Sequence, residues 1–361
     1  MKVCVVFGTR AETIKVAPLL RRFKKNECIS IYTGQHYDPL MSKNFFKDLG
    51  IGNPDYHLKL TKIQNTTTDR ATQTGEVILK LAKIISTLNP DTVIVQGDTN
   101  SVLAATITSL KCGIPISHVE AGLRSYDWRM PEEHNRIAID HLSEFLFAPT
   151  ITSKKILKQE KVHGQIFVTG NTSIDAVEDY VELAEKKSKL KLNFDEFALA
   201  TIHRGENVDN KKIFKSILAG LLQSKISILF PVHPRTKKRL EEFGLYKKLK
   251  NSDNIKMIPP VGYFEILHLM KKSKFIISDS GGIQEEATSP KLSKKVLVIR
   301  KTSDRPEAVK LGFSELVGTE TSKIIKAINK TIKNPEVSSK QSPYGNGNAS
   351  KQIIKILNQR F

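Results

Sequence analysis

The chain has 361 residues, a hydrophobic content of 39% and a formal net charge of +20. The length favours two domains, and the longest apolar runs, such as residues 296–299, are far shorter than the ~18 residues of a membrane-spanning helix. The lysines are scattered and not interleaved with aromatic residues, which argues against a nucleic-acid partner. Three cysteines without a C-x-x-C pair are typical of a reducing compartment. We therefore expect a cytoplasmic protein that binds neither membrane nor nucleic acid.

Short β-branched runs alternate with longer amphipathic stretches in the first half of the chain. The pattern predicts strands at 3–7, 29–33, 92–96, 116–119, 146–148 and 166–169. It predicts helices at 12–25 and 68–88, the second with apolar residues near helical spacing at Val77, Leu81 and Ile85. This order of elements is typical of a parallel sheet with helices on both faces.

The second half repeats the rhythm. Strands are expected at 197–201, 226–230, 275–278 and 296–299, each followed by a helix, and a loop at 338–348 precedes a last helix at 350–359. We therefore predict an α/β protein with two Rossmann-like parallel-sheet domains that face a cleft. The expected domains are residues 1–169 and 170–348, with the boundary near Gly170 and Asn171.

In open parallel sheets, ligands bind at the carboxyl ends of the strands, so the residues that follow each strand are of interest. The turn after the first strand lacks the G-x-G-x-x-G pattern of a nicotinamide enzyme, which excludes that cofactor here. It offers Arg10 and Lys15 instead. Cations at the positive end of a helix are unfavourable for the helix itself. Their presence is explained either by binding of a phosphorylated ligand or by exposure of both side chains to solvent.

Acidic residues follow three further elements of the first half. Asp98 stands in a tight turn before a helix, where an N-cap is the structural alternative to a functional role. Glu120 lies among apolar and small residues, and is either paired with Arg124 or a catalytic acid or base. Glu132 and Glu133 begin a helix, a position that favours carboxylates without any catalytic role. Their convergence on one edge of a sheet favours chemistry.

The turns of the second half favour phosphate binding. Ser280, Gly281 and Gly282 follow a strand and open a helix, so that backbone N–H groups are free to hold a diphosphate. Glu286 can accept hydrogen bonds from a ribose diol, and Arg305 adds a cation. The residues therefore predict that the second domain holds a nucleotide while the first presents carboxylates.

A set of motifs runs in order from Gly8 to Ser350, nearly the whole chain. They are G-T-R-x-E-x-I-K, T-G-Q-H, Q-G-D-T, H-V-E-A-G-L-R-S, P-E-E-x-N-R, T-x-H-R-x-E-N, D-S-G-G-I-Q-E-E-A, R-x-x-x-x-R-P-E-A and S-P-Y-G-N-G-N-A-S. Together they resemble the non-hydrolysing UDP-N-acetylglucosamine 2-epimerases, which share the two-domain fold of the B-type glycosyltransferases. Ala11 stands where the family usually has proline.

The resemblance implies roles for individual residues. The residues implied to hold UDP are Arg10, Lys15, His203, Ser280, Gly281, Gly282, Glu286 and Arg305. The residues implied in catalysis are Asp98, Glu120, Glu132 and His203. Gln35 and His36 match a second, activating UDP-sugar site of bacterial members. The family uses no metal or redox cofactor, and its members are usually homodimers in which the final helix, here 349–361, packs back on the first domain.

The implied reaction is reversible epimerisation at C2 between UDP-N-acetylglucosamine and UDP-N-acetylmannosamine, through a glycal. The C2 hydrogen is not next to a carbonyl, so departure of UDP from C1 must make it acidic before a carboxylate can remove it. A glycosyltransferase of the same fold and a hydrolysing 2-epimerase are the alternatives within sugar chemistry. A basic nucleic-acid-binding protein is the alternative from another class, and it would bind DNA or RNA with a steep salt dependence.

Overall fold

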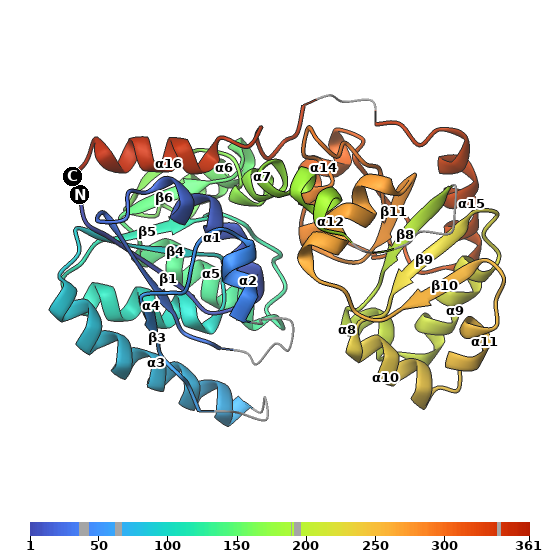
Figure 1. Ribbon diagram of the computed structural model, residues 1–361, viewed down its shortest axis with the longest axis horizontal. Helices are drawn as coiled ribbons and strands as arrows, with labels where there is room; N and C mark the ends of the chain where they lie inside the picture. The colour runs from blue at the N-terminus through green and yellow to red at the C-terminus, as the bar shows by residue number, and fades with distance from the viewer. Residues whose placement is uncertain (36–42, 62–66, 189, 191–195, 338–340) are drawn as a thin grey trace. The chain divides into compact units, whose positions relative to one another are not determined.

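The computed structural model describes residues 1–35, 43–61, 67–188, 190, 196–337 and 341–361 (Figure 1). The chain forms two compact units, Met1–Ala176 together with Tyr344–Phe361, and Val177–Pro343. Their boundary lies inside helix α7 (Thr172–Lys187), a few residues beyond the expected position. Because the helix continues through the boundary, the sequence has no break there that could mark it.

The first unit is built on a parallel sheet with the strand order β3-β2-β1-β4-β5-β6-β7. The strands are β1 (Val3–Phe7), β2 (Cys28–Tyr32), β3 (Tyr56–His57), β4 (Thr92–Gln96), β5 (Ile116–Val119), β6 (Phe145–Ala148) and β7 (Gln165–Val168). The helices besides α7 are α1 (Arg10–Arg22), α2 (Lys43–Asp48), α3 (Thr67–Leu88), α4 (Asn100–Lys111), α5 (Pro131–Leu142), α6 (Ile151–Gln159) and α16 (Ala349–Asn358).

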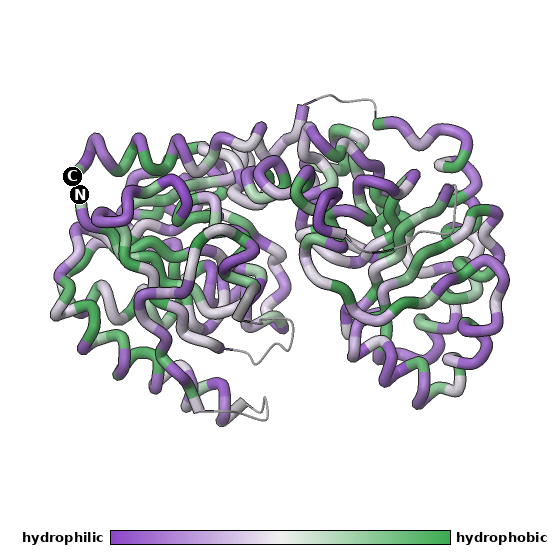
Figure 2. Tube along the Cα trace, in the orientation of Figure 1, coloured by the Kyte–Doolittle hydropathy of each residue, from purple (hydrophilic) through white to green (hydrophobic). Residues whose placement is uncertain are grey.

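Alternate residues of β1 pack into two hydrophobic cores. Cys4 and Val6 belong to a cluster with residues of α3 and α4, whereas Val3, Val5 and Phe7 belong to a cluster with residues of α1 and α16. Successive side chains of a strand point to opposite faces of the sheet, so helices cover both faces. Hydrophobic residues accordingly concentrate along the strands in Figure 2.

The second unit has the strand order β10-β9-β8-β11-β12-β13, again with parallel pairing. The strands are β8 (Phe197–Thr201), β9 (Ser227–Pro231), β10 (Ile255–Ile258), β11 (Phe275–Ser278), β12 (Val296–Val298) and β13 (Ser314–Leu316). The helices are α8 (Gly205–Val208), α9 (Lys211–Leu222), α10 (Pro234–Glu242), α11 (Tyr246–Lys250), α12 (Tyr263–Lys272), α13 (Gly281–Glu286), α14 (Pro306–Lys310) and α15 (Thr321–Lys333).

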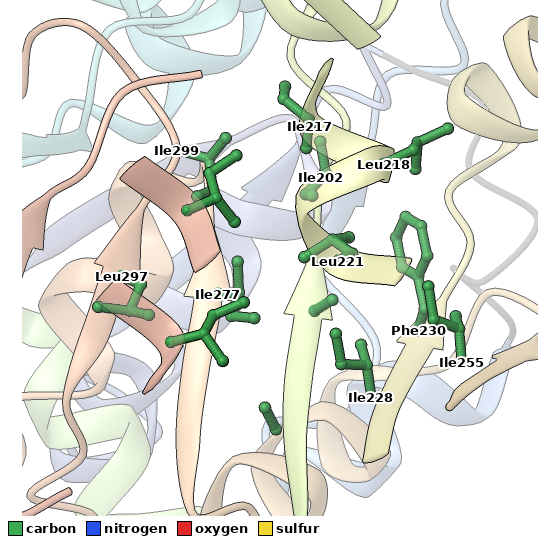
Figure 3. Close-up of a cluster of buried hydrophobic side chains, with 14 of the residues drawn as sticks. Ile202, Ile217, Leu218, Leu221, Ile228, Phe230, Ile255, Ile277, Leu297 and Ile299 are labelled. Carbon is green, nitrogen blue, oxygen red and sulfur yellow. The ribbon is translucent and has the colours of Figure 1, made fainter. Parts of the chain in front are cut away.

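Figure 3 shows a core of the second unit, where side chains from its strands meet those of α9. Ile228, Phe230 and Ile277 project from the sheet toward Ile217 and Leu221 of that helix, and all five are fully buried. Burial of each such side chain stabilises the unit by roughly 1.5–3 kcal/mol.

The prediction of two parallel-sheet α/β units is confirmed, but the sequence pattern missed β3, β10 and β13. β3 has two exposed residues, β10 has one buried residue followed by three half-buried ones, and β13 has three residues, so none gives a buried β-branched run. None of the described helices combines the length and apolar character that a bilayer span requires.

The two sheets share a strand order that reverses direction next to β1 in the first unit and next to β8 in the second. Ligands of open α/β sheets bind at such switch points, beyond the carboxyl ends of the strands. The turns after β1 and β4, and after β8 and β11, are therefore the places to look for chemistry.

Candidate active site

Glu120 directly follows β5 and lies in a left-handed backbone conformation, with φ of 76°. Such a conformation is uncommon for a residue other than glycine and is often found at functional sites. Its carboxylate oxygen Oε2 receives Lys15 Nζ at 2.5 Å, Gln96 Nε2 at 2.8 Å and Asn171 Nδ2 at 3.4 Å. Three donors from three different segments therefore hold this nearly buried carboxylate in its charged form.

Arg124, the alternative partner that the sequence suggested for Glu120, makes other ion pairs. Its guanidinium lies 2.7 Å from Asp140 Oδ2 and 2.5 Å from Glu160 Oε2. Burial opposes the charge on Arg124, but Glu160 and Asp140 outweigh it and raise the pKa of Arg124 above its ordinary value. The interpretation of Glu120 as a partner of Arg124 is therefore wrong.

Asp98 lies in the turn after β4, and its side chain is 28% exposed. Oδ2 receives Arg136 from α5, with NH2 at 2.5 Å and Nε at 3.1 Å. The backbone oxygen of Asp98 accepts Asn135 Nδ2 at 2.9 Å. The N-cap of the following helix is Thr99, whose hydroxyl accepts from the backbone N–H of Val102. The N-cap interpretation of Asp98 is therefore wrong. The carboxylate of Asp98 is partly exposed to solvent and forms an ion pair with Arg136.

The two adjacent glutamates at the start of α5 differ in their surroundings. Glu132 is exposed, whereas Glu133 is buried and accepts hydrogen bonds from Ser125 and Tyr126 and from Arg136 NH1 at 2.9 Å. Burial alone would raise the pKa of Glu133, but these donors outweigh it and the pKa lies below its ordinary value. Sequence reasoning missed this role of Glu133, which joins the 125–126 turn to the arginine that holds Asp98.

The turn after β1 is organised by a second buried carboxylate. Thr9 is the N-cap of α1, and Glu12 Oε2 accepts from the N–H of Gly8 at 2.6 Å. Burial raises the pKa of Glu12. Arg10 lies over the ring of Phe45, 5.8 Å from its centroid. Glu12 therefore fixes the turn from which Arg10 and Lys15 project, a role that the sequence pattern did not reveal.

Gln35, for which the resemblance suggested a role in an activating site, is buried. Its Oε1 accepts from the N–H of Ser101 at 2.9 Å, at the start of α4, and its backbone oxygen accepts Gln73 Nε2 at 3.1 Å. His36 lies outside the described residues. Gln35 thus links the turns after β2 and β4, whatever else it binds.

In the second unit, the fully buried Asp279 joins the turns after β8 and β11. It accepts from the backbone N–H of His203 at 3.1 Å, from that of Arg204 at 3.0 Å, and from Asn207 Nδ2 at 3.0 Å. His203 also lies against His233, with ring centroids 5.3 Å apart. Burial is the main reason that the pKa of His203 is lowered. Asp279 and His233 were missed, although Asp279 directly follows β11 and His233 lies two residues after β9.

The predicted strand-to-helix turn of the second unit is present. Ser280 is the N-cap of α13, which Gly281 and Gly282 open, and Glu286 at its end is half-buried. Arg305 is buried and contacts Glu285. The structure thus places these predicted residues on two neighbouring loops of one sheet edge.

A carboxylate between arginines completes this edge. Asp304 lies 2.9 Å from Arg300 NH1 and 3.3 Å from Arg305 NH1. Burial would raise the pKa of Asp304, but Arg305, Arg300 and Arg204 outweigh it and hold the pKa well below its ordinary value. Three arginines therefore surround Asp304, and guanidinium groups are suited to bind an anionic ligand. Over the described ranges, no group of three or more His, Cys, Asp or Glu side chains is arranged to hold a metal ion.

The chain is similar to known proteins over nearly its whole length. The family model for UDP-N-acetylglucosamine 2-epimerase matches residues 20–358. The UDP-N-acetylglucosamine 2-epimerase of Methanocaldococcus jannaschii is 41% identical over 99% of both chains. Its crystal structure in complex with UDP-GlcNAc and UDP has a TM-score of 0.86 and 40% identity, covering 99% of this chain and 100% of that one. A UDP-2,3-diacetamido-2,3-dideoxy-D-glucuronate 2-epimerase of Pseudomonas aeruginosa is 34% identical over 99% of both chains. The chain therefore belongs to the UDP-N-acetylglucosamine 2-epimerase family of enzymes.

Proposed function

We propose that this enzyme interconverts UDP-N-acetylglucosamine and UDP-N-acetylmannosamine without releasing a hydrolysed sugar. The observation that carries the proposal is the pair of carboxylates at the switch point of the first unit. Asp98 is held by Arg136 and Glu120 by Lys15, so both carboxylates are fixed in position at the carboxyl ends of adjacent strands. Fixed carboxylates are what a reaction with a positively charged intermediate requires.

The chemistry follows from the weak acidity of the C2 hydrogen. The C1–O bond breaks first, its electron pair leaves with the β-phosphate oxygen of UDP, and positive charge develops at C1. A carboxylate of the group Asp98, Glu120 and Glu132 then takes the C2 proton, and the C–H electron pair forms the C1–C2 double bond of the glycal. Protonation of C2 from the opposite face and return of the UDP oxygen to C1 give the epimer. Atoms and charge balance without a cofactor.

UDP is proposed to be held by Arg10, Lys15, His203, Ser280, Gly281, Gly282, Glu286 and Arg305. The N–H groups at the start of α13 and the surrounding cations suit a diphosphate. We also propose His203 as a catalytic residue. Because burial lowers its pKa, His203 is neutral near pH 7 before UDP binds and is able to take up a proton as negative charge develops on the leaving group.

Lys15 is proposed to bind UDP, and it also forms an ion pair with the proposed catalytic residue Glu120. Its Nζ lies 2.5 Å from Glu120 Oε2. A diphosphate that binds Lys15 would compete with Glu120 for the same ammonium group. The carboxylate would then lose a partner and become a stronger base at the moment when the substrate binds.

A reaction in D₂O followed by NMR tests the function. The proposal expects UDP-N-acetylmannosamine with deuterium at C2 and little free UDP. Free UDP with N-acetylmannosamine would identify a hydrolysing enzyme, and absence of C2 exchange, with activating levels of UDP-N-acetylglucosamine present, would exclude epimerisation of this sugar. The substrate named for the Pseudomonas aeruginosa relative should be run in parallel, because faster exchange with it would change the assigned substrate.

Two further properties are proposed with the function. A homodimer is the state that the resemblance to the family implies, and light scattering of the purified protein would test it. A reducing compartment such as the cytoplasm is supported by the three free cysteines, of which Cys28 has a pKa raised to about 12 by burial and nearby negative charge. A fluorescent fusion in the source cells would test the location.

A further inference from the structure

His118, in β5, is a buried histidine that the proposed reaction does not use. Its side chain is 1% exposed and that of its neighbour Asp140, in α5, is fully buried. Nδ1 lies 2.7 Å from Asp140 Oδ1, and Nε2 lies 2.9 Å from the backbone oxygen of Gly97. Both nitrogens therefore make short contacts to oxygen atoms.

These contacts determine the protonation of the ring. A carbonyl oxygen can only accept, so Nε2 carries a proton. Asp140 receives two donors on its other oxygen, Arg124 NH1 at 2.7 Å and the N–H of Gly122 at 3.1 Å, which suits the carboxylate form. A carboxylate also only accepts, so Nδ1 carries a proton as well. Acceptors that face both ring nitrogens are the hydrogen-bond geometry of a doubly protonated imidazole.

The surrounding charges balance under this assignment. His118 and Arg124 are the cations, Asp140 and Glu160 the anions, and each contact joins opposite charges. His141 lies at the outer end of this series of contacts, with its Nε2 3.7 Å from Glu160 Oε2. Glu160 is partly exposed and shares Arg124 with the fully buried Asp140, so a neutral His118 would leave the charge of Asp140 less well compensated.

The pair connects the two turns that present the proposed catalytic carboxylates. His118 binds the carbonyl of Gly97, the residue before Asp98, and Asp140 binds the N–H of Gly122, two residues after Glu120. Both glycines have left-handed backbone conformations, with φ of 81° and 82°. Glycine reaches alternative backbone conformations easily. A hydrogen bond from outside each turn therefore restricts the conformation of that turn.

We propose that the His118 imidazolium and Asp140 are positioning residues that hold the Asp98 and Glu120 turns at one fixed separation. The inference rests on the proposed function of those carboxylates. Neither His118 nor Asp140 touches the substrate in this proposal. Their loss misplaces the reacting groups, and a displacement of about 1 Å can cost on the order of 100-fold in rate.

The first test examines protonation in the wild-type enzyme, without reference to activity. Protein labelled with ¹⁵N-histidine is studied by two-dimensional NMR at pH 8.5, with the His118 signals assigned from their loss in His118→Gln. If that variant does not fold, the His118 signals are assigned as the ring N–H signals that exchange most slowly with solvent, because this ring is buried. Two N–H nitrogens are expected for His118. An unprotonated ring nitrogen in His118 would overturn the proposal.

The second test separates positioning from binding. His118→Gln is expected to lower kcat by about 10- to 100-fold while KM and UDP affinity stay within about twofold, at a temperature where circular dichroism shows both proteins folded. The matched control is His163→Gln, whose side chain is 59% exposed and whose kcat should not change. Wild-type kcat in a folded His118→Gln would overturn the inference. A wild-type enzyme without C2 exchange would overturn the proposed function, while the NMR result would still decide the charge of His118.

Discussion

The two units share one strand order but differ in the charge that follows their strands. In the first unit, the turns at the switch point present carboxylates, each with a cation as partner: Asp98 with Arg136 and Glu120 with Lys15. In the second unit, the turns present His203 and several arginines, with Asp279 and Asp304 as internal partners. The backbone topology therefore defines where a ligand binds, and the residues after the strands define which chemistry takes place.

The largest effect is expected in the first unit. Glu120→Gln should lower turnover by about three orders of magnitude, because general acid–base groups contribute about 10²–10⁴-fold. It should not weaken UDP binding, because Lys15 loses the carboxylate that competes with the diphosphate. Asp98→Asn should behave in the same way. C2 exchange in D₂O and calorimetric titration with UDP measure the two quantities. Glu144→Gln, at a surface position with 42% exposure, is the control. Turnover near that of the control in both variants would remove these carboxylates from the mechanism.

A smaller effect, on stability, is expected where the carboxylates are supported. Glu133→Gln should lower the free energy of unfolding at pH 7 by about 2 kcal/mol, because buried donors lose a charged acceptor. The folded-state pKa of Glu133 lies below its ordinary value of 4.5. Its contribution is thus present above pH 4.5 and is lost as the pH falls through the lowered pKa. Denaturant unfolding across this range should show the two proteins converge in acid, and a gap that widens in acid would contradict the assignment.

The converse pattern is expected in the second unit. His203→Ala should weaken UDP binding by about tenfold, the size of one hydrogen bond to a charged group, as measured by calorimetry. Comparison with Glu120→Gln is the most informative, because His203→Ala is expected to lose UDP affinity and Glu120→Gln is expected to lose turnover. Unchanged UDP affinity in His203→Ala would take His203 out of the nucleotide site. The exposed His163→Gln serves again as the control.

The smallest effect is expected at exposed ion pairs. On α10, Lys237 and Glu241 lie 3.9 Å apart with both side chains more than half exposed. Glu241→Gln should change the free energy of unfolding by less than about 0.5 kcal/mol, because water screens such pairs. A thermal unfolding curve that overlays the wild type would agree. A change as large as that of Glu133→Gln would mean that burial does not explain the difference between the two carboxylates.

The sequence predicts the sheets well because buried strands give continuous apolar runs, as in residues 3–7 and 92–96. It also points to Asp98, Glu120 and His203, because each follows such a strand. It does not reveal what holds them. Lys15 and Glu120 are separated by 105 residues, and Asp279 and His203 by 76, so these contacts exist only once the sheets have formed. A local pattern carries no information on such pairs.

The support of the carboxylates shows a further limit of sequence reasoning. Glu133 follows Glu132 directly, yet one is buried and the other exposed. Neighbouring positions on a helix point in different directions, about 100° apart. Which of the two faces the protein interior depends on how α5 is seated against the sheet, and this is a property of the tertiary structure.

The last helix, α16, determines the order in which the two units can complete their hydrophobic cores during synthesis. Asp175 is fully buried and accepts from the N–H of Ser350 at 2.8 Å and that of Ala349 at 3.1 Å, while Ile353 and Leu357 share a core with Val3 of the first strand. Chains are made from the N-terminus and domains fold as units during synthesis. The second unit, Val177–Pro343, is contiguous and leaves the ribosome before the residues of α16 do. The unit whose synthesis begins first is therefore the one that completes its core last.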